Sequence, residues 1–184
     1  GKGLLGRIRG SSSFDGLVDA CSSFVSRIEA ERFLLLAPSD DQLVVAAQLS
    51  FDLTTYRRFS PPSVFFSSQF QDTTWYTLRG ECLEPFFAYF SSKERDSLTG
   101  LFVRPVQIDD KRVYVVIAES TLDVRRKSVD TARAESHLEA LLEAIRAHGK
   151  LIESVSLSGQ INKDPAVIDA RIDSALSDGK TGSL

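Results

Sequence analysis

The sequence has no methionine, one tryptophan, two cysteines and two histidines among its 184 residues. Both cysteines, Cys21 and Cys82, lie inside apolar segments, where a free thiol behaves as a small hydrophobic side chain. We therefore expect both to be buried, reduced and structural, as is usual in a cytosolic protein. His137 and His148 are too far apart for a metal-binding pair on one helical turn and have no cysteine beside them, so we predict no metal site.

Long apolar runs and an excess of charge are also missing. No run approaches the roughly 18 residues that a membrane span needs, and the first residues lack the order of a signal peptide. The formal net charge of −3 gives no electrostatic attraction to nucleic acid or to an anionic membrane. We therefore expect a cytoplasmic protein without nucleic-acid binding and without membrane insertion.

No catalytic motif keeps the structural context that its chemistry requires. GKGLLG near the start and DGKTG near the end resemble phosphate-binding loops, but neither follows a strand and opens a helix. Serines are plentiful, yet none sits in a nucleophile-elbow motif. We predict no catalytic residue and no enzymatic activity, and the sequence specifies no cofactor.

The composition that is present favours one domain with an appendage, because 184 residues with 42% hydrophobic content fill a single core. Residues 1–12 are glycine-rich and read as a tag remnant or flexible arm. Residues 13–148 form the expected domain, including a long exit helix. Residues 149–184 form a C-terminal extension with a short amphipathic helix that starts at Asp164-Pro165.

The first half of the domain alternates between helix and strand patterns. Ser13 or Asp15 caps an amphipathic helix that runs to about Ile28. Phe33–Ala37 and Leu43–Leu49 then predict a β-hairpin around a turn of Pro, Ser and Asp residues. Residues 51–74 contain Pro61-Pro62 and read as a crossing loop with one turn of helix.

The second half begins with a strand at Trp75–Leu78. A short buried helix follows, whose inward face consists of Leu83, Phe86, Phe87 and Phe90. Ser91 to Glu94 has the spacing of a capping box and starts another helical turn.

Two β-branched strands then follow at Leu101–Val106 and Val113–Ala118. Each is apolar on both faces, so we expect them to be adjacent and central in a covered sheet. Pro105 marks either a bulge or a point where the strand leaves a partner. Ser120 or Thr121 caps the exit helix, which reaches Gly149 at a length of about 40 Å.

This order resembles the GAF domain family and its PAS-like relatives. The segment LTGLFVRPVQIDDKRVYVVIAES is similar to the hairpin and exit helix that end many GAF domains, and RFLLLAPSDDQLVVAAQLS is similar to their first hairpin. The resemblance covers residues 14–148 and implies an α+β fold with a central antiparallel sheet flanked by helices. It also implies a sensory or regulatory role. Profilin-like and longin-like folds share part of this order and are alternative predictions.

Two departures limit what the family implies. The Asn-Lys-Phe-Asp-Glu signature of cyclic-nucleotide-binding members is missing from residues 14–148. Chromophore-binding members usually attach the pigment through a cysteine beside a histidine, whereas Cys82 is followed by Leu83. Of the activities known in the GAF family, the resemblance therefore implies only the sensing of a ligand or a protein partner.

Arginines beside aromatic residues are the candidate ligand-binding set. Arg57 and Arg58 lie in the crossing, where they suit an anionic or planar ligand, or else form a surface pair over packed rings. A pocket there would be lined by Phe65, Phe66, Trp75 and Phe87. Arg104, inside a strand, needs a partner, and Glu119, Asp72 or Glu81 would supply a structural ion pair in place of a ligand contact.

We therefore predict a non-catalytic sensory module that binds a small molecule or a protein partner. The alternatives are a protein–protein adaptor with a filled core and, least favoured, a degenerate enzyme that depends on Arg57 or Arg104. A cavity lined by the aromatic residues would favour the sensor over the adaptor.

The exit helix carries apolar residues at alternating four- and three-residue steps, the seam of a paired helix. This spacing predicts a homodimer with Leu138, Leu141 and Ile145 in its interface. In the alternative, Gly149 ends the helix and these residues pack inside one subunit. Arg125-Arg126-Lys127 suggests an acidic partner or a solvated face.

Overall fold

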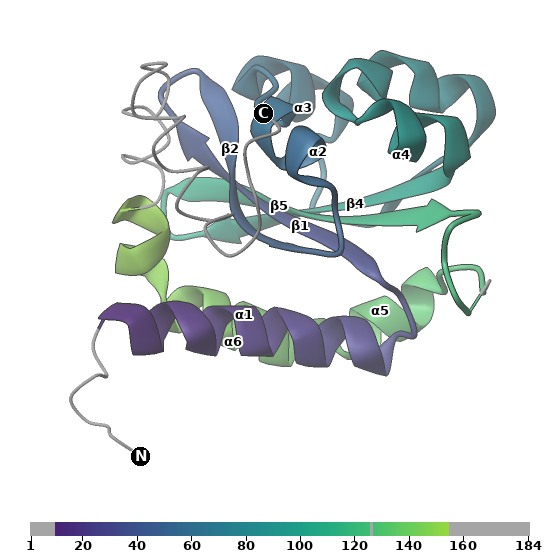
Figure 1. Ribbon diagram of the computed structural model, residues 1–184. Helices are drawn as coiled ribbons and strands as arrows, with labels where there is room; N and C mark the ends of the chain where they lie inside the picture. Colours follow the sequence, from purple (N-terminus) through teal and green to yellow (C-terminus); the bar gives the residue numbers. More distant parts are fainter. Residues whose placement is uncertain (1–9, 126, 155–184) are drawn as a thin grey trace, which may run out of the picture.

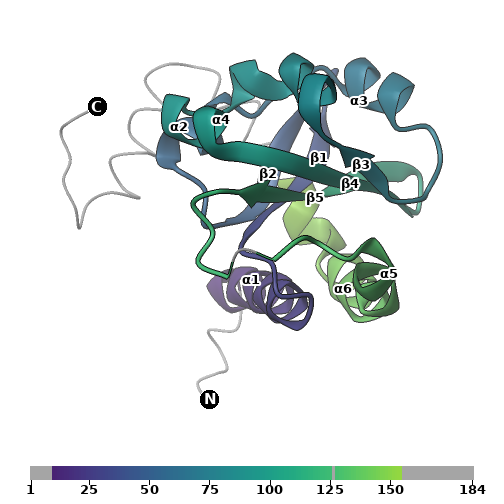
Figure 2. The same ribbon diagram turned by 90° about the vertical axis from the view of Figure 1, so that its right-hand side faces the viewer.

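The computed structural model describes residues 10–125 and 127–154. These residues form three layers, in which one antiparallel sheet lies between two layers of helices (Figures 1 and 2). Helices α1, α5 and α6 cover one face of the sheet, and α2, α3, η2 and α4 cover the other. Within the described part of the chain, no helix is long and apolar enough to cross a bilayer.

The described residues place five strands in the order β2-β1-β5-β4-β3. The strands are β1 (Arg32–Ser39), β2 (Gln42–Leu49), β3 (Tyr76–Leu78), β4 (Leu98–Ile108) and β5 (Lys111–Ser120). Every neighbouring pair is antiparallel, which confirms the predicted α+β fold class. The doubly apolar β4 and β5 are central, as their sequences predict, because only strands covered on both faces are apolar on both.

Pro105 is accommodated without a bulge of its own. It lies opposite Tyr114 in the β4–β5 ladder, and the irregularity in that ladder falls between Leu98 and Gly100. The last β3–β4 pair is Tyr76 with Val103, so β3 has already left β4 where the proline stands. This is the second of the two alternatives that the sequence allows.

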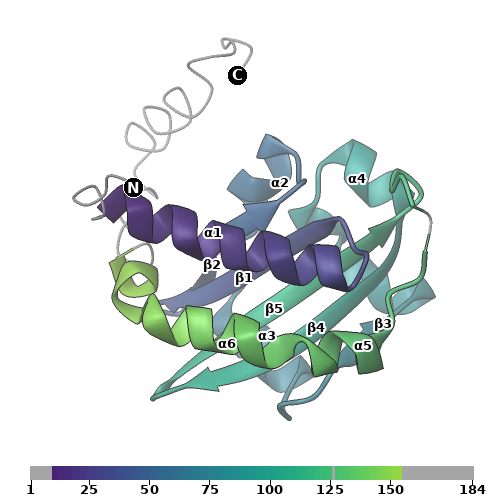
Figure 3. The ribbon, with the colours of Figure 1, turned by 90° about the horizontal axis from the view of Figure 1, so that it is seen from below.

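Helix α1 (Gly10–Arg27) begins before the caps predicted at Ser13 or Asp15. It lies beside α6 across the sheet (Figure 3). Residues 10–12 therefore belong to a helix, whereas the remainder of the predicted arm and the predicted helix after Asp164 lie outside the described residues.

The exit helix begins later than its sequence predicts. Strand β5 continues to Ser120, and the helix starts at α5 (Thr131–Ser136), where Asp130 accepts hydrogen bonds from the amides of Ala132 and Arg133 at 3.0 and 3.2 Å. Helix α6 (Leu138–Ala147) follows, and residues 149–154 are helical again, so Gly149 does not end the helix.

Tertiary contacts explain the late start. Glu31, immediately before β1, accepts hydrogen bonds from the amides of Val124 and Arg125 at 2.7 and 3.3 Å. Asp123 pairs with Arg32 and accepts from the Ser120 amide. These partners satisfy backbone and carboxylate groups that a helix starting at Ser120 would use locally.

The opposite face is more helical than predicted. The crossing forms α2 (Leu53–Arg58) and α3 (Ser63–Gln69). Ser91 caps α4 (Ser92–Ser97), since its Oγ accepts from the Glu94 amide at 3.2 Å. The reciprocal half of the predicted capping box is not formed, because the Ser91 amide donates to Thr55 Oγ1 instead.

Cys82 is exposed, which corrects its predicted burial, while Cys21 is buried. Its segment, Gly80–Tyr89, is the 3₁₀ helix η2, in which residues three apart share a side. Leu83 and Phe86 therefore both face inward and are buried, and Cys82 faces water.

Candidate functional site

Packed phenylalanine rings fill the interior beneath α2, α3 and η2. The Phe66 centroid lies 5.9 Å from that of Phe65, 5.2 Å from Phe70, 5.9 Å from Phe86 and 5.1 Å from Tyr114. Such separations are those of rings in direct contact. The structure therefore packs Phe65 and Phe66 as part of a core.

The four predicted pocket-lining residues lie on both faces of the sheet. Phe87, like Phe65 and Phe66, packs against the aromatic core. Trp75 packs against the other core, beneath α1 and α6. The structure therefore brings three of the four to one face, and Trp75 does not line a common pocket with them.

The three predicted arginines are also separated. Arg57 and Arg58 are exposed on α2, and Arg58 Nη1 donates to the Phe90 carbonyl at 3.2 Å. Arg104 binds Glu135 of α5 through Nε and Nη2 at 3.1 and 3.0 Å. This pairing is the structural ion pair predicted for Arg104, but with a partner outside the set named from the sequence.

Glu119, one of the partners proposed for Arg104, has other contacts. Its Oε1 lies 2.6 Å from Arg79 Nη1, and its Oε2 accepts from the Val129 amide at 2.9 Å. It thereby fixes the connection that leads into α5. The Arg104 guanidinium beside Glu135 lowers the pKa of that carboxyl.

The predicted dimer residues are covered within one chain. Leu138, Leu141 and Ile145 are 2%, 1% and 0% exposed and belong to the core that α1 and the sheet share with α6. This arrangement is the alternative in which the residues pack inside one subunit. A homodimer through them stays a prediction, and it would require α6 to leave its own sheet.

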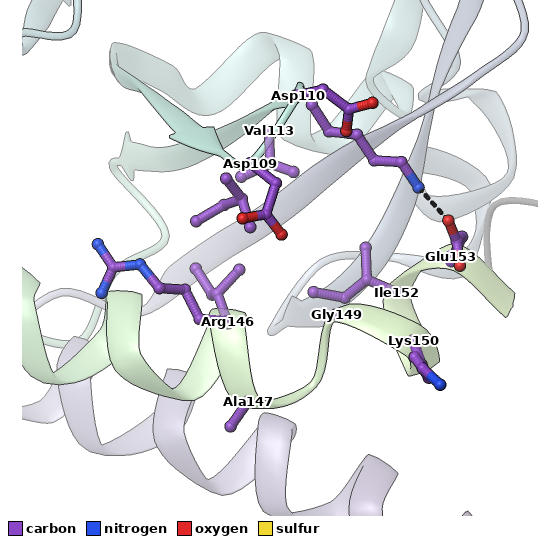
Figure 4. Close-up of a pocket in the computed structure, with 12 residues that line it drawn as sticks. Asp109, Asp110, Val113, Arg146, Ala147, Gly149, Lys150, Ile152 and Glu153 are labelled. Carbon is purple, nitrogen blue, oxygen red and sulfur yellow. Dashed lines mark hydrogen bonds and ion pairs between the residues drawn. The ribbon is translucent and has the colours of Figure 1, made fainter.

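A cavity of about 450 Å³ lies between the β4–β5 turn and the end of α6 (Figure 4). Its apolar wall consists of Ile108, Val113, Ile145 and Ile152. Charged residues surround this wall: Asp109, Asp110, Lys111, Arg146, Lys150 and Glu153. The cavity therefore joins the sheet to the exit helix through both apolar and charged groups.

The turn itself positions one carboxylate in the cavity. Asp109 has φ 55°, in the left-handed region, where Asp is more readily tolerated than most residues. Figure 4 shows its carboxylate directed toward α6, into the space between Arg146 and Ile152. No hydrogen bond or ion pair of this carboxylate occurs among the described residues.

Ion pairs engage most of the cavity's cations. Lys111 Nζ lies 2.7 Å from Glu153 Oε2, which connects β5 with the last helical turn, and this hydrogen bond lowers the pKa of Glu153. Arg146 lies 3.5 Å from Glu139, outside the cavity. The site has no signal in the local sequence, because its walls come from segments about 40 residues apart and no motif marks their meeting.

Solved structures share the fold at low sequence identity. The GAF domain/HD domain protein from Geobacter sulfurreducens matches with a TM-score of 0.55 and 10% identity, over 78% of this chain and 97% of that chain. The blue-light absorbing PixJ GAF-domain from Thermosynechococcus elongatus has a TM-score of 0.52 and 14% identity, over 85% and 97%.

A type II free methionine-R-sulfoxide reductase from Thermoplasma acidophilum also matches, with a TM-score of 0.52 and 11% identity over 79% of this chain and 94% of that chain. These similarities confirm the GAF-like fold and, at such identities, the fold alone.

No curated protein matches the sequence. The family model TP_0208_N, described as an uncharacterised protein N-terminal domain, matches residues 2–154. This match spans the described sheet, both helical layers and the cavity. The chain belongs to the TP_0208_N family, and its fold is GAF-like.

Proposed function

We propose that this chain is a non-catalytic sensory module that binds a small molecule in the cavity between the β4–β5 turn and α6. The observation that carries the proposal is the cavity of about 450 Å³ with an apolar wall and a charged rim. Ligand sites typically combine such a wall with a few polar groups that orient the ligand.

The position of the cavity supports a regulatory role. One wall is the β4–β5 hairpin in the sheet, and the other is α6 with the helical residues 149–154. A ligand that contacts both walls favours the state in which the last helical turn is docked. Binding would thereby change the stability of the exit helix, which leads to the C-terminal extension.

An adaptor that acts through a protein partner is the second candidate. The dense ring contacts around Phe66 and Phe86 favour it, since a filled aromatic core is what this alternative predicts. The degenerate enzyme has less support, because Arg104 is engaged by Glu135. Homodimerisation and a cytoplasmic location remain further predictions.

Native mass spectrometry of the freshly purified full chain tests the sensor. We expect a retained small molecule in the wild type, and its loss in Gly149→Leu, because Gly149 lines the cavity and an added Cβ there meets no atom within 4 Å. Ala140→Leu, at an exposed position of α6, is the matched control and should retain the molecule.

Repeated absence of a bound molecule, together with failure of the probes described below to bind, would contradict the sensor and favour the adaptor. Equal retention by Gly149→Leu and Ala140→Leu would place the binding site elsewhere in the chain.

A further inference from the structure

We infer that the ligand of this cavity is an aliphatic cation, an alkylamine or a related compound with a primary ammonium group. The inference rests on the proposed function and specifies the chemical class of its ligand. The Asp109 carboxylate, which has no partner in residues 10–125 and 127–154, and the aliphatic wall together carry it.

The wall selects for an aliphatic body. Its apolar side chains are the isoleucines Ile108, Ile145 and Ile152 with Val113, and none of the described residues that line the cavity is aromatic. Planar ligands such as nucleobases gain much of their binding energy from stacking on aromatic rings. Branched aliphatic walls instead favour a flexible or branched hydrocarbon through burial of its surface.

The rim selects for positive charge. Asp109 points into the cavity (Figure 4), and neither it nor Asp110 has an ion-pair partner among the described residues. A ligand ammonium placed between Ile145 and Ile152 would meet the Asp109 carboxylate. Charge-assisted hydrogen bonds of this kind are about twice as strong as neutral ones.

The cations of the rim do not offer an equivalent site for an anion. Lys111 is engaged by Glu153 at 2.7 Å, and Arg146 by Glu139 at 3.5 Å. Lys150 is exposed and extends away from the β4–β5 turn in Figure 4. A carboxylate or phosphate ligand would therefore have to compete with an existing ion pair for Lys111 or Arg146, or draw Lys150 toward the cavity.

Titration of the isotopically labelled full chain with n-hexylamine, followed by NMR, tests the inference. We expect saturable shifts of the amide resonances of residues 109–111 and 152–153. Sodium hexanoate and 1-hexanol, which keep the chain length and replace the ammonium, should produce much smaller shifts.

The Asp109→Asn variant removes the charge and keeps the size and the tolerance for a positive φ. Its affinity for n-hexylamine should fall about fivefold, the effect of losing one partly exposed ion pair. Asp40→Asn is the matched control, because Asp40 begins the β1–β2 turn with φ 58° and lies outside the cavity. This control should bind like the wild type.

Each contrary outcome has a definite meaning. Tighter binding of hexanoate, or equal affinities in Asp109→Asn and the wild type, would overturn the cation and leave the sensor proposal standing. If neither amine nor hexanoate binds while native mass spectrometry shows a retained molecule, the aliphatic cation is overturned and the sensor stands. If the retained molecule is absent too, both proposals fail.

Discussion

Glu94 is a buried carboxylate that binds neutral donors. It is 4% exposed, and it accepts hydrogen bonds from the Asp52 amide at 2.8 Å and from the Thr55 hydroxyl. Ser91 completes the network, since its amide donates to Thr55 Oγ1 and its hydroxyl donates to Asp52 Oδ2, both at 2.8 Å. These contacts join the beginning of α2 to the beginning of α4.

Glu94→Ala should therefore destabilise the protein by about 2 kcal/mol, because it leaves buried donors without an acceptor. Glu84→Ala, at an exposed position of η2, should change stability by less than about 0.5 kcal/mol. Urea unfolding followed by circular dichroism measures both. Equal midpoints for the two variants would show that the network does not stabilise the fold.

The two thiols should differ sharply in reactivity. Burial raises the pKa of Cys21 to about 12, which keeps it protonated at neutral pH, whereas Cys82 is exposed. Because the thiolate is the reactive form, a chromogenic disulfide reagent should label one thiol in the native protein and both in denaturant. Cys82→Ser should abolish the native signal. Rapid labelling of two native thiols would contradict the burial of Cys21.

Glu135 should make stability depend on pH in the acid range. Its pKa is lowered from 4.5, first by the hydrogen bond from Arg104, so the folded state binds this proton less tightly than the unfolded state. The stabilisation is thus present above pH 4.5 and is lost as pH falls through the lower folded value. The free energy of unfolding falls between pH 6 and pH 3. In Glu135→Gln this fall should be smaller by about 0.5 kcal/mol, as expected for a solvent-screened pair. Melting curves recorded across this pH range test the prediction. The control, Glu143→Gln, should keep the pH dependence of the wild type.

Among the helices and strands, tertiary contacts determine several boundaries that sequence patterns cannot. The central strands were predictable because Val113–Ala118 is apolar on both faces, a local signal of a covered sheet. The exit helix was predicted too early because Ser120 and Asp123 are good capping residues. Asp123 instead pairs with Arg32, 91 positions away, and no local pattern carries that information.

Gly149→Ala should stabilise the protein by up to about 1 kcal/mol. Residue 149 is the first helical residue after the turn at His148, its φ lies outside the left-handed region, and an added Cβ has open space, so alanine gains part of its helix propensity over glycine. Ala147→Gly, at the exposed last residue of α6, should have the opposite effect. Thermal unfolding measures both, and no change for Gly149→Ala would show that residues 149–154 are not helical in solution.

For the molecule as a whole, the architecture was readable from sequence and the site was not. Antiparallel order follows from short turns such as Asp109-Asp110 between two strands, which is a local feature. The cavity depends on Lys111 meeting Glu153 across the chain, and the predicted aromatic pocket failed to assemble in one place because Trp75 lies on the other face of the sheet from Phe66. The spacing of residues along the sequence indicates neither the cavity nor the separation of Trp75 from Phe66.

Leu141→Glu separates a core role from a dimer role for the exit helix. Leu141 is 1% exposed within one chain, so an ionised glutamate there should destabilise the fold by about 4 kcal/mol through an uncompensated buried charge. Ala140→Glu, one residue earlier on the exposed side of α6, should leave the fold intact. Thermal unfolding and analytical ultracentrifugation at tens of micromolar are measured on both variants and the wild type. A dimeric wild type with a folded, monomeric Leu141→Glu would instead place Leu141 in a subunit interface, since a residue needed for the core of each chain cannot be charged without loss of the fold.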